Sequence, residues 1–176
     1  MCSHSDNTKE AIDGFTNKLY PAILHQFSLI TTSDYYLANT FLEESSEKIY
    51  FILKEMKTEF QSLITYEKRL VFPSILNAFD DSIIKQNNFH PNINDLLVLT
   101  KHKENRLSQL VAELINEINL LKFIEKDDSI SSLVDLMQND FVEKRHQWNN
   151  LIHECLHNCI CLKKTNNSEI NTLSHE

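Results

Sequence analysis

The sequence predicts an all-α protein, and two observations lead to this fold class. One glycine and three prolines in 176 residues leave few of the turns that a sheet protein needs. The apolar residues instead recur three and four positions apart over long stretches, which is the spacing of an amphipathic helix. Four such stretches of roughly 30 residues, joined by short or modest connections, predict an up-down-up-down four-helix bundle. We expect a single domain, because this length suffices to bury a sizeable core.

The first two helices follow from their apolar spacing and their end signals. The first is expected from about Glu10 into the low forties, with a possible interruption at 31–34 and a bend at Pro21. The second is expected from Ser45 to about Phe79, with Pro73 inside its last turns. A polar connection follows, and it contains the helix-breaking pair at 90–91.

The third helix is expected from about Asn94 to Phe123, and the fourth from Ser129, a plausible N-cap, to about Lys163. The predicted domain organisation is therefore a disordered N-terminus over 1–9, one bundle over 10–163 and a polar C-terminal tail over 164–176.

Composition narrows the range of partners. The net charge of −8 argues against nucleic acid or an anionic membrane as the main partner. No stretch reaches the length of a membrane span, and the N-terminus has neither the basic flank nor the apolar run of a signal peptide. With no export signal, the four cysteines are expected to be thiols in a cytoplasmic protein.

Glu67 is the most informative single residue. It lies near the middle of the apolar face of the second predicted helix, which consists of Leu53, Met56, Phe60, Leu63, Ile64, Leu70 and Val71. Burying an unpaired carboxylate costs several kcal/mol. Three interpretations stay open: Glu67 is paired with a cation or a hydrogen-bond partner, it is a metal ligand, or the helical register is misjudged. We predict that Glu67 is buried against polar atoms of at least one other helix.

Other polar residues also fall on predicted apolar faces, where bundles place their metal and cofactor sites. Gln26 lies on that of the first helix, Glu104 lies just inside the edge on the third, and Cys155 and Cys159 stand one turn apart on the fourth. Buried cysteine also serves as a small core hydrophobe. The histidines His25, His102, His146, His153 and His157 map to the flanks, which predicts positions at the rim or in solvent.

The segment from Leu63 to Pro73 resembles a hallmark of hemerythrin-like proteins. In that family a His-x-x-x-Glu on the second helix precedes a Leu-Phe-Pro-like triplet, and the His and Glu ligate a non-haem di-iron centre. Here Glu67 matches the carboxylate, 71–73 matches the triplet and Leu63 occupies the place of the histidine. The third helix is similar to the iron–sulfur-centre repair branch, with Glu104 where a ligand histidine would stand.

The fourth helix allows two alignments with this family. One places His153 and His157 at the ligand positions, and the other, which keeps the apolar residues in register, places Cys155 and Cys159 there. We prefer the second, because core packing constrains register more tightly than a ligand match does. Under it none of the family's histidine ligands is present, so neither an ordinary di-iron site nor oxygen binding is expected.

Three functions are compatible with these residues. The first is a divergent hemerythrin-like protein with a metal ion held by Glu67, Glu104, Cys155 and Cys159, which the resemblance would place in iron or nitric-oxide stress handling or iron–sulfur repair. Carboxylates suit iron, whereas two thiolates shift the preference toward zinc. The second is a bundle that has lost its metal and works as a binding or regulatory module. The third, an enzyme with Glu67 as general base, ranks last because the sequence shows no nucleophile or substrate pocket.

Overall fold

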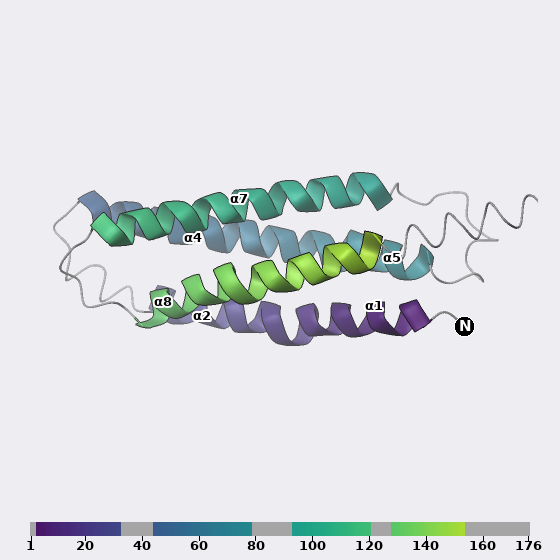
Figure 1. Cartoon of the computed structure of the whole chain (residues 1–176). Helices are drawn as coiled ribbons and strands as arrows, with labels where there is room; N and C mark the ends of the chain where they lie inside the picture. The colour runs from purple at the N-terminus through teal and green to yellow at the C-terminus, as the bar shows by residue number, and fades with distance from the viewer. Residues whose placement is uncertain (1–2, 33–43, 79–92, 121–127, 154–176) are drawn as a thin grey trace, which may run out of the picture.

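The structure is a computed structural model that describes residues 3–32, 44–78, 93–120 and 128–153. Every regular element within these ranges is helical and no strand occurs among them, which confirms the all-α class. The four described ranges each form a long helical segment, and these segments lie side by side (Figure 1).

The first segment consists of α1 (Ser3–Asp13), a π-helical stretch η1 (Gly14–Leu19) and α2 (Tyr20–Thr32). It begins earlier than the sequence predicted, and residues 3–9 are helical. Thr8, within this stretch, is fully buried. The predicted interruption at 31–34 lies at the edge of the described residues.

The second segment consists of α4 (Glu44–Tyr66), η2 (Glu67–Val71) and α5 (Phe72–Ala78). The third is the single helix α7 (Ile93–Leu120). The fourth consists of α8 (Asp128–Asp135), η3 (Leu136–Phe141) and a further helical stretch over residues 142–153. The predicted starts of these three segments lie within one residue of those observed.

Two pairs of neighbours organise this arrangement. α4 packs along α7, and α2 packs along α8. α1 and α5 lie side by side at the end where the chain begins, and α2 and α8 lie at the other end (Figure 1).

An aromatic cluster fills the space between the segments. Phe15 lies against Tyr20, Phe72 and Trp148, and Phe60 lies against Phe141, with ring centroids 5.5–6.5 Å apart. Such pairs contribute beyond the area that they bury. The rings come from all the segments except α7, which contributes the buried side chains of Leu107, Leu110, Val111 and Leu114. The buried positions on α4 match the apolar face predicted for the second helix from Leu53 to Ile64.

Three of the four segments contain a wide π-helical turn. In two of them a backbone N–H donates to the carbonyl five residues earlier: Tyr20 to Phe15, and Phe72 to Glu67. A proline follows one residue later in each case, at Pro21 and Pro73. Proline lacks an N–H, and in a regular α-helix its ring clashes with the carbonyl four residues before it. A wider turn at this place relieves that clash.

The π-helical turn changes which residues reach the core. A π turn adds one residue, so the side chains after it rotate relative to a straight α-helix. Leu70, predicted to lie on the apolar face, is 46% exposed, whereas Val71 and Phe72 are buried. The prediction for Leu70 was therefore wrong, because it assumed an uninterrupted period of 3.6 residues.

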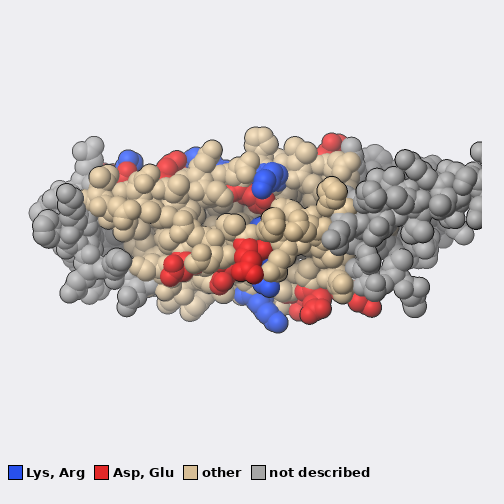
Figure 2. All heavy atoms as spheres, viewed as in Figure 1, with Lys and Arg blue, Asp and Glu red and all other residues tan. Residues whose placement is uncertain are grey.

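The outer surface mixes charges of both signs. On the face shown in Figure 2, the described basic residues lie beside acidic ones and do not form an extended basic patch. None of the described helices combines the length and the apolar character needed to cross a membrane.

Candidate functional site: a buried guanidinium between two carboxylates

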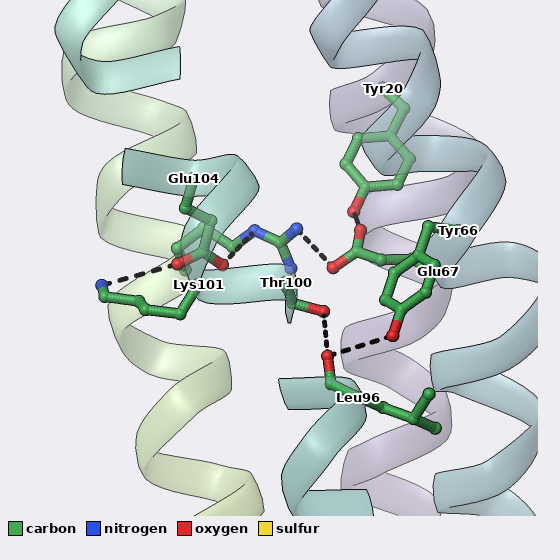
Figure 3. A network of polar contacts seen from close by, with 8 residues as sticks. Tyr20, Tyr66, Glu67, Leu96, Thr100, Lys101 and Glu104 are labelled. Carbon is green, nitrogen blue, oxygen red and sulfur yellow. Dashed lines mark hydrogen bonds and ion pairs between the residues drawn. The ribbon is translucent and has the colours of Figure 1, made fainter. Parts of the chain in front are cut away.

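Glu67 lies in the centre of the helical assembly with no exposure to solvent. The Tyr20 hydroxyl donates a hydrogen bond to its Oε2, and the Arg145 guanidinium donates from Nη2 to its Oε1. Tyr20 begins α2, and Arg145 belongs to the helical stretch after η3. Figure 3 shows the Tyr20 ring pointing at the Glu67 carboxylate. The prediction that Glu67 is buried against polar atoms of another helix is confirmed, and of the three interpretations the structure shows a paired carboxylate.

Arg145 connects Glu67 to a second buried carboxylate. Its Nε lies 3.2 Å from Glu104 Oε1, a close ion pair in which the N–H is not aligned for a regular hydrogen bond. The side chain of Arg145 is 5% exposed, and its guanidinium carbon lies 4.9 Å from the centre of the Phe15 ring and 5.2 Å from that of Phe141. Ring faces attract cations, so aromatic and carboxylate groups together hold the charge of Arg145 in the core.

The network reaches the surface through α7. Lys101 Nζ lies 3.5 Å from Glu104 Oε2, and the Lys101 side chain is 63% exposed. Glu104 therefore contacts a cation on each side, one buried and one in contact with water (Figure 3). Below it, the hydroxyl of buried Thr100 donates to the Leu96 carbonyl at 3.0 Å. The Tyr66 hydroxyl, 3.5 Å from the same carbonyl, ties α4 to α7 at this level.

Burial and pairing compete in setting the charge states of this network. Burial raises the pKa of Glu67, while the Arg145 charge and the hydroxyl of Tyr20 act in the opposite direction. Burial also raises the pKa of Tyr20 well above its ordinary value, so its hydroxyl keeps its proton and can act as a donor at neutral pH. For Arg145, burial lowers the pKa, but the anionic partner Glu67 and the neighbours Tyr20 and Glu104 outweigh it, and the pKa is raised.

Three of the network side chains, Tyr20, Glu67 and Arg145, lie at a π-helical turn or about one turn beyond it, whereas Glu104 belongs to the regular helix α7. Tyr20 follows η1, Glu67 opens η2, and Arg145 lies four residues after the last residue of η3. Single π-helical turns occur often at functional sites. Here they bring polar side chains from three segments toward one point in an otherwise apolar core.

The arrangement does not fit a metal ion among the described residues. Both oxygens of Glu67 and both oxygens of Glu104 already face donors or cations of the protein. A metal ion would have to enter beside the positive guanidinium of Arg145, which the Coulomb term opposes. Within the described ranges no group of three or more histidine, cysteine, aspartate or glutamate side chains comes together in a way that could hold a metal.

The other predicted site residues have separate positions. His25, His102, His146 and His153 are exposed, as their flank positions predicted. Cys155, Cys159 and His157 lie outside the described residues, so a role for them as ligands stays a prediction. Gln26 is half-buried, and its side-chain oxygen is enclosed without a hydrogen-bond partner among the described residues.

Sequence reasoning missed the two partners of Glu67, although a signal for each was present. Arg145 lies four residues after Phe141 and three before Trp148, on the predicted apolar face of the fourth helix. Tyr20 lies three residues before Ile23 on that of the first helix. Arg145 is thus a cation on the apolar side of another helix, which makes it a candidate partner for the buried carboxylate of Glu67.

Comparisons with protein-family models, with curated proteins and with solved structures gave no match for this chain. The hemerythrin-like relationship therefore stays a prediction from the motif around Glu67.

Proposed function

We propose that this chain is a metal-free binding or regulatory module, built as an up-down-up-down four-helix bundle of hemerythrin-like type. In this module the Arg145 guanidinium occupies the place that a core metal would take. The side-by-side segments in Figure 1 and the match of Glu67 and 71–73 to the family motif support this topology and ancestry.

One observation carries the proposal: Arg145 lies between Glu67 and Glu104 with its side chain 5% exposed. Two inward carboxylates need a positive charge in a core of low polarity. A guanidinium provides that charge and a planar set of donors. A metal that displaced it would leave Arg145 among Phe15 and Phe141 without its partners, at a cost of several kcal/mol.

The same geometry ranks an enzyme with Glu67 as general base last. A general base must reach the proton that it abstracts. Glu67 has no exposed surface, and its two oxygens accept from Tyr20 and Arg145. A structural role in specifying which helices pack together agrees better with this closed arrangement.

A second candidate is the hemerythrin-like metal protein, binding iron or zinc and acting in iron or nitric-oxide stress handling or iron–sulfur repair. The observation that favours it is the convergence of Glu67 and Glu104 from neighbouring segments on one point. Its ligand set would also need Cys155 and Cys159.

Elemental analysis of the full chain, purified without an affinity tag, separates the two candidates. The proposal predicts iron and zinc far below one ion per chain and a melting temperature that a strong chelator does not change. The melting temperature of a matched variant, Cys155→Ser with Cys159→Ser, should likewise be the same with and without chelator. Stoichiometric metal, lost together with thermal stability on chelation, would contradict the proposal and support the metal protein.

A further inference from the structure

A shallow groove runs between the second and third helical segments, away from the buried network. It is lined by residues of α4, η2 and α7: Gln61, Ser62, Thr65, Tyr66, Arg69, Leu70 and Lys103. The residues of α4 and η2 form two rows with a spacing of four, so each row follows one side of the helix over two turns. The groove is therefore elongated along the helix axis.

The charge of this groove is opposite to that of the whole chain. The net charge of the chain is −8, yet two of the lining residues, Arg69 and Lys103, are cationic and none is acidic. Lys103 Nζ donates to the Ser62 hydroxyl at 2.8 Å, which holds the ammonium over the groove. Burial and the negative charge of Asp95 raise the pKa of Tyr66.

These cations differ from several others on the chain in having no ion-pair partner among the described residues. Lys48, Lys101, Arg106 and Arg145 each lie within ion-pair distance of a glutamate. Arg69 and Lys103 have no such contact within the described ranges. An unpaired arginine beside a lysine is suited to an anionic ligand, because the planar guanidinium matches a carboxylate with two parallel hydrogen bonds.

The groove also offers apolar surface next to these charges. Leu70 is 46% exposed, and Tyr66 is half-buried with its hydroxyl directed to the Leu96 carbonyl. The exposure of Leu70 follows from the π-helical turn η2, which turns this side chain away from the core. A ligand for this groove should therefore combine negative charge with at least one apolar side chain.

We propose that this groove binds a short acidic peptide segment of a partner protein, with carboxylates on Arg69 and Lys103 and an apolar side chain on Leu70 and Tyr66. The elongated form and the mixed lining favour a peptide over a compact small anion. The attraction is local, because beyond about 10 Å salt screens the negative charge of the rest of the chain. This inference goes beyond the proposed function, since none of the groove side chains forms a hydrogen bond or ion pair with Arg145, Glu67 or Glu104 within the described ranges. The hydroxyl of Tyr66, which Figure 3 also draws, contacts the Leu96 carbonyl.

The test is fluorescence anisotropy of the full chain with a labelled peptide of sequence Glu-Leu-Glu-Glu-Leu-Glu. We expect saturable binding that weakens as salt increases, at least a tenfold loss of affinity in Arg69→Glu with Lys103→Glu, and little change in Lys54→Glu with Lys68→Glu. The second pair makes the same change in net charge at exposed lysines outside the groove. Circular dichroism establishes that each variant is folded.

Three results would overturn the proposal: no saturable binding to the wild-type chain, equal losses in both variants, or equal binding of a peptide with lysine in place of glutamate. Inorganic phosphate that competes as well as the peptide would reduce the site to a simple anion site and also overturn it. If the groove variant fails to fold, amide NMR spectra of the wild-type chain provide the test. The proposal then requires that adding the peptide changes the chemical shifts of residues 61–70 and Lys103. A negative result for peptide binding would not change the conclusion drawn from the elemental analysis about metal content.

Discussion

The Arg145 guanidinium is the residue on which the polar part of the core depends. It contacts Glu67 and Glu104 from two other segments, and it lies over the rings of Phe15 and Phe141. Lysine could provide the charge, but its ammonium is a single point with no planar set of donors. The geometry of the network thus needs arginine in particular.

Arg145→Lys is therefore expected to lower the free energy of unfolding, although it conserves charge. Losing a hydrogen bond to a charged group typically costs about 1.5–3 kcal/mol. The measurement is urea denaturation, with Lys144→Ala at the neighbouring exposed position as the control, which should change stability by less than about 0.5 kcal/mol. Equal changes in the free energy of unfolding at the two positions would mean that the planar set of guanidinium donors does not contribute to stability.

Tyr20 allows a prediction of pH dependence. Because its pKa is raised in the folded protein, its contribution is fully present below the unfolded pKa of about 10 and is lost as the pH rises through the folded pKa. Tyr20→Phe should cost about 1.5–3 kcal/mol at neutral pH, since a donor to a buried carboxylate is lost.

The difference between wild type and Tyr20→Phe should then shrink above about pH 10. Denaturation curves at neutral and alkaline pH measure this, with Tyr50→Phe at an exposed position as the matched control. A difference that stays constant with pH would show that the Tyr20 hydroxyl does not deprotonate in step with unfolding.

At the scale of elements, the three π-helical turns decide which side chains enter the core. Regular periodicity predicted the helical segments and most of their buried residues, because packing imposes a period near 3.6. It could not predict an added residue within a turn. For that reason Leu70 was placed in the core. Tyr20 and Arg145 were missed for a different reason: their spacing puts them on apolar faces, but the spacing does not say which residues of two helices meet.

The changed register at η2 predicts unequal effects of two leucine substitutions. Leu63→Ala, at a fully buried position, should cost about 2–5 kcal/mol. Leu70→Ala, at the exposed position after the π-helical turn begins, should change stability by less than about 0.5 kcal/mol. Thermal or urea denaturation of both variants decides, and similar losses would indicate a straight α-helix through residues 67–71.

Gly14 is the first residue of η1, and replacing it is expected to raise the stability of the protein, whereas the changes above lower it or leave it unchanged. Its backbone has no positive φ, and a Cβ added there meets nothing within 4 Å. Gly14→Ala should therefore stabilise the protein by about 0.5–1 kcal/mol, because it restricts the unfolded chain. Calorimetry should show a rise of about 2–4 °C per kcal/mol. A lower melting temperature would mean that η1 needs the freedom of glycine.

At the scale of the whole molecule, the all-helical class and the starts of the second, third and fourth segments followed from the sequence, because one glycine and long apolar periods leave few alternatives. The centre of the site followed too, since a carboxylate on an apolar face requires a partner. Whether that partner is a metal or a guanidinium depends on how the fourth segment is rotated against the second. Local periodicity carries no information on that rotation.

The central claim is that Arg145, with no metal ion, neutralises Glu67. A double-mutant cycle of Glu67→Leu and Arg145→Met, measured by urea denaturation in the presence of a strong chelator, tests it most directly. Each single change should cost about 3–5 kcal/mol, because it removes one partner of a buried ion pair and leaves the other charge in the core without it. The double variant should cost less than their sum by about 2–3 kcal/mol. Additive losses in the presence of chelator, or a coupling that is found only when the cycle is repeated without chelator, would contradict the claim.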